Sequence, residues 1–324
     1  MSVAQAPRIL LLGKDGQVGW ELQRALAPLG ELVALGRAGG TEPATGASLV
    51  GDLADLEGLA ATVQAVRPAA IVNAAAYTAV DQAEREPELA QRVNADAVAV
   101  LAQAAARCGA WLVHYSTDYV FDGSGQRPWH EDDPVAPLSV YGRSKRAGEE
   151  AVRASGCRHL ILRTQWVYGV RGGNFARTML RLAREREVLR VVDDQWGAPT
   201  GADLIADVTA CALRQALAGG VHAAALSGTY HLAAAGATTW CGYARYLIEQ
   251  ARQIAPHAGW RVHTIEAIPT AAYPTPARRP ANGRLDTTRL QTTFGLHLPP
   301  WQHGVARWVA MVCGDAWAGW PNPA

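Results

Sequence analysis

Short apolar runs alternate with amphipathic segments along the first half of the chain. The runs are residues 8–12, 31–35, 69–72, 111–114 and 159–162. Continuous apolarity over so few residues indicates strands that are buried on both faces. Helical patterns lie between them at 20–26, from Asp55 to Arg67, at 88–108 and around Tyr141 and Lys145. Strands that alternate with helices predict an α/β fold with a doubly wound parallel sheet.

The pattern changes after Trp166. A basic helix is expected at 175–187, a strand at 189–192 and a further helix that begins at Thr200 or Asp203. The run 229–232 reads as a strand that returns to the first sheet. We therefore expect a nucleotide-binding domain at residues 1–165 and a smaller substrate-binding domain at 166–324, with one or more segments returning to the sheet.

A glycine-rich turn follows the first predicted strand. It reads Gly13-x-x-Gly16-x-x-Gly19 and leads directly into a helical pattern. Strand, glycine turn and helix form the setting in which backbone N–H groups bind a pyrophosphate at a helix N-terminus. The alternative is a tight structural turn. The second strand ends in Gly36-Arg37 without a carboxylate for a ribose hydroxyl, which favours NADPH over NADH unless Arg37 is merely exposed.

Several other side chains are expected at the carboxyl ends of strands, where ligands of such sheets bind. Asp52 stands where it can reach an adenine, and the small residues of 73–76 allow a flat cofactor to approach the backbone. Asn94 either bonds buried backbone or faces solvent. The pair Arg278-Arg279 in a proline-rich segment either binds a diphosphate or is simply exposed.

The stretch from Tyr115 to Lys145 contains the candidate acid–base chemistry. Tyr141 precedes Lys145 by four residues, so both side chains lie on one helix face. A nearby ammonium favours the phenolate and lowers the pKa of the tyrosine, which then protonates a carbonyl oxygen more readily. Thr117, at the tip of the preceding strand, is placed to hold the same oxygen. This spacing also occurs by chance on amphipathic helices.

Composition excludes several classes of protein. No apolar run approaches the roughly 18 residues of a membrane span, and the first residues lack the basic start of a signal peptide. The five cysteines are widely spaced and odd in number, which indicates reduced thiols in a cytoplasm. A net charge of +1 without a basic tract makes nucleic acid an unexpected partner.

Together these motifs resemble the dTDP-4-dehydrorhamnose reductase family of the extended short-chain dehydrogenases/reductases. The resemblance lies in Gly13–Leu22, Asn73–Ala76, Ser116–Phe121, Tyr141-x-x-x-Lys145, Arg163–Tyr168, Asp194–Gly201 and Tyr273–Pro280. It spans nearly the whole chain and implies a Rossmann-type fold. It also implies hydride transfer from NADPH or NADH to C4 of dTDP-4-dehydro-β-L-rhamnose, a step in dTDP-rhamnose and cell-surface polysaccharide biosynthesis.

The resemblance also implies roles for single residues. Tyr141 would protonate the C4 oxygen, Lys145 would bind the nicotinamide ribose, and Thr117 would hydrogen-bond the reacting oxygen. The implied cofactor contacts are Gly13, Gly16, Gln17, Val18, Arg37, Asp52, Leu53, Ala75, Ala76, Tyr77, Thr78, Tyr141 and Lys145. The implied sugar-nucleotide contacts are Thr117, Asp118 and Trp166, with Arg278 and Arg279 as candidates for the diphosphate.

Two further expectations concern assembly and rival functions. Some family members dimerise through Mg²⁺ held by carboxylates. Glu21 is present here, but the segment 312–314 has no glutamate, so we expect no metal-bridged dimer and name no metal ligands, with Mg²⁺ kept as an alternative. The chain is expected to be a monomer or homodimer. One rival is a sugar-nucleotide epimerase or dehydratase. The motif typical of dehydratases is Thr-Asp-Glu at the place where this chain reads Thr117-Asp118-Tyr119. The other is a non-catalytic regulatory subunit, although such subunits typically lose part of the Thr/Tyr/Lys set.

Overall fold

A computed structural model describes residues 6–42, 45–219 and 223–314. Its centre is a six-stranded sheet, in the order β12-β7-β6-β5-β1-β2, with all neighbours parallel. The strands are β1 Arg8–Leu12, β2 Glu31–Leu35, β5 Ala70–Asn73, β6 Trp111–Thr117, β7 Arg158–Thr164 and β12 Gly228–His231. The predicted Rossmann-type α/β class is confirmed.

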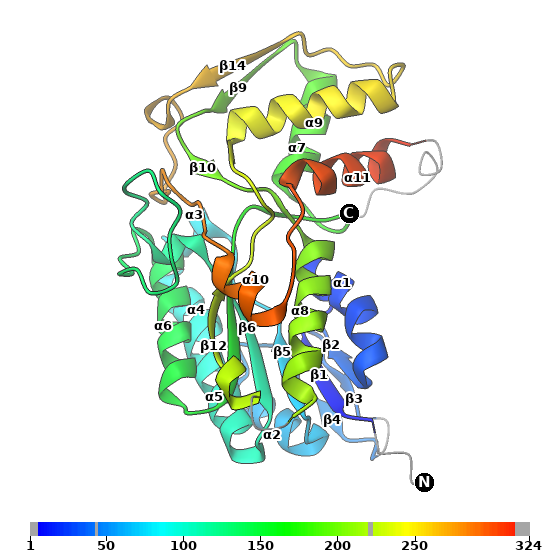
Figure 1. The fold of residues 1–324 in the computed structure, drawn as a ribbon, viewed down its shortest axis with the longest axis vertical. Helices are drawn as coiled ribbons and strands as arrows, with labels where there is room; N and C mark the ends of the chain where they lie inside the picture. The colour runs from blue at the N-terminus through cyan, green and yellow to red at the C-terminus, as the bar shows by residue number, and fades with distance from the viewer. Residues whose placement is uncertain (1–5, 43–44, 220–222, 315–324) are drawn as a thin grey trace.

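Helices cover both faces of the sheet (Figure 1). The helices α1 Gln17–Leu26, α8 Ala202–Leu217 and α10 Thr288–Phe294 share one apolar core with it. The helices α2 Leu56–Val66, α5 Ala97–Cys108 and α6 Val140–Ala154 share the other. Continuous apolar strands are explained by this double cover, since each strand buries side chains on both faces.

A second layer of elements lies beyond the carboxyl edge of the sheet, at the top of Figure 1. It contains α7 Phe175–Glu185, α9 Trp240–Ile254, α11 Trp301–Cys313 and the parallel pair β9 Val188–Val192 and β14 Thr264–Ile268. These elements have a core of their own. Because α8, β12 and α10 nevertheless pack with the sheet, the division at residues 165 and 166 stays a prediction.

The remaining elements are short. They are β3 Gly40–Thr41, β4 Ser48–Leu49, β8 Val167–Tyr168, β10 Trp196–Gly197, β11 Thr200–Gly201, β13 Thr238–Thr239, α3 Val80–Ala83 and the turns η1 Ala27–Leu29, η3 Asp118–Val120, η4 Ala223–Leu226 and η5 Thr270–Ala272.

The helix expected at 88–108 is interrupted. It consists of α4 Pro87–Gln91, a π-helical turn η2 Arg92–Asp96, and α5. Asn94 is buried in this turn, where its amide bonds the backbone N–H and C=O of Tyr77 and the hydroxyl of Ser144. The buried alternative for Asn94 is therefore the correct one, and the wider turn delivers its side chain to these partners.

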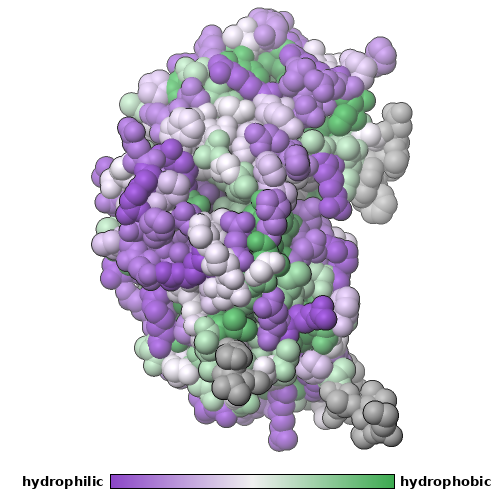
Figure 2. Space-filling model, viewed as in Figure 1, coloured by the Kyte–Doolittle hydropathy of each residue, from purple (hydrophilic) through white to green (hydrophobic). Residues whose placement is uncertain are grey.

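Hydrophilic side chains predominate on the face in Figure 2, and the hydrophobic ones form small separate groups. None of the helices in the described ranges has the length and apolar character needed to span a membrane.

Candidate active site

A cavity of about 690 Å³ opens at the carboxyl edge of the sheet. Residues that follow β1 and β5 line it, together with the ends of β6 and β7, as expected for parallel sheets. From the second layer it is lined by Trp166, Gly173, Asn174 and Trp240. The candidate nucleotide site and the candidate acid–base residues therefore share one space.

The glycine turn forms one end of this cavity. Gly13 has a φ of +86°, and a Cβ atom there would lie 2.6 Å from the backbone nitrogen of Ala75. Only glycine permits this approach. The helix α1 begins after Gly16, and no side chain caps it. Its first N–H groups are thus available to an anion, so the loop fits the pyrophosphate of a dinucleotide.

Arg37 lies at the end of β2, where it lines the cavity and is exposed. The carboxylate of Asp15 approaches Gly36 so closely that a Cβ atom at residue 36 would overlap it. Lys14 forms an ion pair with Asp15 at 3.2 Å. An acidic side chain at position 36 would therefore displace Asp15, and Arg37 is left as the cation that faces the cavity from β2.

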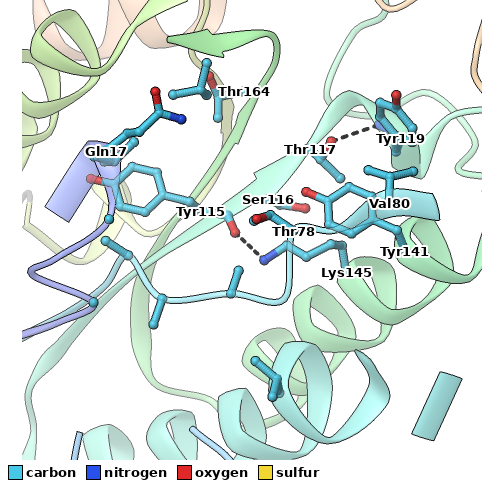
Figure 3. A pocket seen from close by; sticks show the side chains of 18 of the residues that line it. Gln17, Thr78, Val80, Tyr115, Ser116, Thr117, Tyr119, Tyr141, Lys145 and Thr164 are labelled. Atoms are coloured by element: carbon cyan, nitrogen blue, oxygen red, sulfur yellow. Dashed lines mark hydrogen bonds between the residues drawn. The ribbon is translucent and has the colours of Figure 1, made fainter. Parts of the chain in front are cut away.

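Thr117, Tyr141 and Lys145 all line the cavity and lie near one another (Figure 3). Thr117 ends β6, and α6 supplies the other two after Ser139 caps it with a 3.1 Å bond to the N–H of Gly142. The Nζ atom of Lys145 donates a 2.6 Å hydrogen bond to the carbonyl oxygen of Tyr115. The structure thus places the three predicted catalytic residues together.

Burial, rather than the neighbouring ammonium, dominates the acidity of these groups. It raises the pKa of Tyr141 to about 12, with a smaller lowering from the hydrogen bond to Thr117. It lowers the pKa of Lys145 to about 8, against the raising effect of Glu149. The expected lowering of the phenol pKa by Lys145 is therefore not seen, because desolvation penalises both charged forms.

Asp118 follows Thr117 and is almost fully buried. One carboxyl oxygen accepts a 3.0 Å hydrogen bond from the Thr117 hydroxyl, and the other has no partner among the described residues. Burial raises the pKa of Asp118 to about 7, although the bond from Thr117 lowers it. An unpaired buried acceptor beside the candidate catalytic residues calls for a donor from a ligand.

Trp166 adopts a φ of +45°, which is unusual for a residue with a side chain. Its ring stacks on Trp240 with centroids 3.7 Å apart. A Cβ atom at Gly197 would lie 2.6 Å from the same ring, so its position is tightly bounded. Trp240 was not predicted, because it is remote in sequence and reaches Trp166 through the β10–β13 pairing.

Asn174 is a second residue that the sequence did not indicate. Its amide donates to the Gln17 side chain at 3.0 Å and to the Gly169 carbonyl at 2.9 Å. It also caps α7 by accepting from the N–H of Arg177. This side chain joins the glycine loop to the second layer. An asparagine directly before the helical pattern at 175 was the available signal, but it identifies a cap and not the contact with Gln17.

Three expected ligand residues do not line the cavity. The hydroxyl of Tyr77 donates a 2.6 Å bond to Glu86, while Thr78 and Ala76 face the cavity. Arg278 is exposed, and Arg279 forms an ion pair with Asp81 at 2.7 Å. The other residues predicted for cofactor and substrate lie in the cavity wall. Gln165, Thr164 and Ser116 join them and were not predicted.

Within the described ranges, no three His, Cys, Asp or Glu side chains are grouped so as to hold a metal ion. Glu21 on α1 instead lies near Arg24, Asp203 and Asp207, and burial raises its pKa.

Comparison with known proteins places the chain in a family. The family model described as RmlD substrate binding domain matches residues 7–313. A dTDP-4-dehydrorhamnose reductase of Escherichia coli is 55% identical over 300 residues, covering 92% of this chain and 96% of that protein. One from Bacillus anthracis, solved in complex with NADP, is 32% identical with a TM-score of 0.80, covering 94% of this chain and 99% of the other. One from Clostridium acetobutylicum has a TM-score of 0.82 at 30% identity, with the same coverage.

These similarities extend over almost the whole chain and include both the glycine loop and the second layer. The predicted class, a nicotinamide-dependent oxidoreductase, is confirmed by them. The protein belongs to the dTDP-4-dehydrorhamnose reductase family.

Proposed function

We propose that this protein reduces the C4 ketone of dTDP-4-dehydro-β-L-rhamnose to the alcohol of dTDP-L-rhamnose. The observation that carries the proposal is the meeting of Thr117, Tyr141 and Lys145 in the cavity that also contains the glycine loop. The names of the similar reductases support the substrate.

In this reaction NADPH, when bound, supplies the hydride that C4 receives. The hydroxyl of Tyr141 gives its proton to the C4 oxygen, so the ketone becomes an alcohol and the tyrosine becomes a phenolate. Lys145, which is buried, stabilises that phenolate and holds the nicotinamide ribose. Thr117 orients the ketone oxygen through its hydroxyl. A high phenol pKa keeps Tyr141 protonated and ready to donate at neutral pH.

The remaining wall of the cavity binds the two nucleotides. The residues proposed for the cofactor are Gly13, Gly16, Gln17, Val18, Arg37, Asp52, Leu53, Ala75, Ala76 and Thr78, all of which line the cavity. Asp118 accepts hydrogen bonds from sugar hydroxyls, and Trp166 packs against the sugar nucleotide. Arg37 pairs with the 2′-phosphate, which gives the protein a preference for NADPH over NADH. A diphosphate role for Arg278 and Arg279 requires that this segment move toward the cavity.

We also infer a cytoplasmic location, because both nucleotides are cytoplasmic metabolites and all five cysteines are free thiols.

The direct experiment supplies dTDP-4-dehydro-β-L-rhamnose and follows the oxidation of NADPH. The proposal predicts that one NADPH is consumed for each dTDP-L-rhamnose formed. Folded protein that binds NADPH but turns over no sugar nucleotide contradicts the proposal. Formation of a C3 or C5 epimer without net NADPH consumption would instead favour an epimerase.

A further inference from the structure

A fully buried histidine lies behind the candidate catalytic lysine. His114 of β6 is 0% exposed and stands three residues before Thr117. Its Nε2 atom is 3.4 Å from Nζ of Lys145, and its Nδ1 atom is 3.4 Å from Nδ2 of Asn73. Both neighbours present nitrogen atoms, so the imidazole lies between two groups that ordinarily donate hydrogen bonds.

The orientation of Asn73 is determined by the backbone. The N–H of Ala75 can only donate, and it lies 3.2 Å from Oδ1 of Asn73. The amide nitrogen of Asn73 therefore faces His114, and this orientation favours the tautomer whose Nδ1 accepts from it. Burial and the adjacent Lys145 hold the pKa of His114 well below its usual range, so the ring is neutral and carries one proton.

A neutral ring has only one acceptor nitrogen, so it cannot accept hydrogen bonds from both Asn73 and Lys145. If Nδ1 accepts from Asn73, the proton is on Nε2 and points at Lys145, which must then offer the lone pair of a neutral amine. If Lys145 is an ammonium that donates to Nε2, the ring proton is on Nδ1 and meets the amide protons of Asn73. The tautomer of His114 and the protonation of Lys145 are thus coupled.

We propose that His114 is a positioning residue of the reaction: its imidazole, oriented by Asn73, holds the side chain of Lys145 and decreases the fraction of Lys145 that carries a proton. The inference rests on the proposed function, because the lysine matters through Tyr141. Through His114, β6 would influence the protonation of Lys145, whose ammonium stabilises the phenolate of Tyr141.

The other charged and polar groups in this region come from α6, β7, η3, β6 and η2. Tyr141 and Glu149 lie on α6 itself, and Glu149 is held by Arg163 of β7 through a 2.7 Å ion pair. Asp118 lies in η3, and the carbonyl oxygen of Tyr115 comes from β6. On the side of η2, Asn94 contributes a neutral amide to Ser144. His114 is a partner in none of these contacts, so we expect them to persist when it is replaced.

The first test is the pH dependence of kcat/KM in His114→Gln. A glutamine carbonyl accepts a hydrogen bond from the lysine ammonium, so the alkaline limb is expected to move up by about one pH unit. His231→Gln is the matched control, since His231 is equally buried but bonds Asp286 and lies beside Phe121. An alkaline limb that stays in place or moves down in active His114→Gln, as compared with the control, overturns the proposal.

The second test needs neither the His114→Gln variant nor turnover. In the wild-type protein with ¹⁵N-labelled histidine, the ring nitrogens of His114 are followed by NMR across the titration of Lys145. A spectrum of His231→Gln, which lacks the signals of the other buried ring, assigns those of His114. The proposal predicts a neutral ring with its proton on Nε2 at pH values above that titration. A proton on Nδ1 under those conditions overturns it. Absence of ketone reduction would reject the proposed function while leaving this result interpretable.

Discussion

The amino group of Lys145 donates a 2.6 Å hydrogen bond to the carbonyl oxygen of Tyr115, two residues before Thr117. This bond ties α6 to the end of β6. Because Tyr141 lies one helical turn before Lys145, the same bond sets the position of the phenol relative to Thr117. The acid–base geometry therefore depends on a contact between a side chain and the main chain of a central strand.

Removing the phenol hydroxyl tests the proton donor. In Tyr141→Phe we expect NADPH to bind with nearly unchanged affinity and kcat to fall by roughly 10²- to 10⁴-fold, the usual contribution of a general acid. Cofactor titration and steady-state kinetics measure the two quantities. Tyr230→Phe is the control, because its hydroxyl bonds Leu226 and it does not line the cavity. Near-normal turnover in Tyr141→Phe would remove Tyr141 as the acid.

The rate should depend on the charge of Lys145. Its pKa is lowered to about 8 by burial, so the ammonium is present below that pH and lost above it. We expect kcat/KM to decline as pH rises through about 8. In Lys145→Arg the guanidinium stays charged, so the variant is slower but should lack this alkaline limb. A limb that persists unchanged in Lys145→Arg would assign it to another group.

The buried carboxyl of Asp118 makes stability depend on pH. Burial raises its pKa from 3.8 to about 7, so the folded state binds more protons than the unfolded state between these values. The free energy of unfolding therefore falls as pH rises through this window, by about 4 kcal/mol at most. Asp118→Asn should unfold at higher urea concentration than wild type at pH 8, with the difference shrinking toward pH 5.

The same variant should bind the sugar nucleotide more weakly, because an amide replaces a carboxylate acceptor. If Asp118→Asn is no more stable than wild type at pH 8, the ionised carboxylate is not a cost to the fold.

Cofactor preference should depend on Arg37. In Arg37→Ala the dissociation constant of NADPH should rise roughly tenfold, since charge-assisted bonds to a phosphate contribute about 1.5 kcal/mol or more. That of NADH should stay unchanged, because NADH has no 2′-phosphate. Arg107→Ala, an exposed arginine on α5, serves as the control for net charge. Equal effects on both cofactors would exclude a 2′-phosphate contact.

The stacked pair Trp166 and Trp240 should act on the sugar nucleotide and not on NADPH. In Trp240→Ala, Trp166 loses the ring that supports its unusual backbone conformation, so we expect a higher KM for the sugar nucleotide. Fluorescence titration should show unchanged NADPH binding. Trp260→Ala, whose indole bonds Ala255 on the far end of α9, is the control. A KM that does not change separates Trp240 from substrate binding.

The elements that were predicted correctly depend on local patterns, and so do the glycine turn and the Tyr141–Lys145 pair, whose roles stay predictions. The strands β1 and β2, the glycine turn and the Tyr141–Lys145 spacing are each encoded within a few neighbouring residues. The contacts that were missed join distant parts of the chain. Arg279 meets Asp81 across 198 positions and Asn174 meets Gln17 across 157. No periodicity marks such pairs, because packing of the second layer creates them.

The pKa of Tyr141 could not be predicted from the sequence either. Helical spacing places an ammonium on the same face as the phenol, which suggests a lower value. The depth of burial, which raises it to about 12, arises from the tertiary structure around the end of β6.

Isotopic labelling shows directly whether the hydride of NADPH moves to C4 of the sugar. NADPH deuterated at the transferable position is mixed with dTDP-4-dehydro-β-L-rhamnose and this protein, and the product is analysed by NMR. We expect dTDP-L-rhamnose with one deuterium, located at C4. Deuterium that remains in the cofactor, or that appears at another carbon of the sugar, would contradict it.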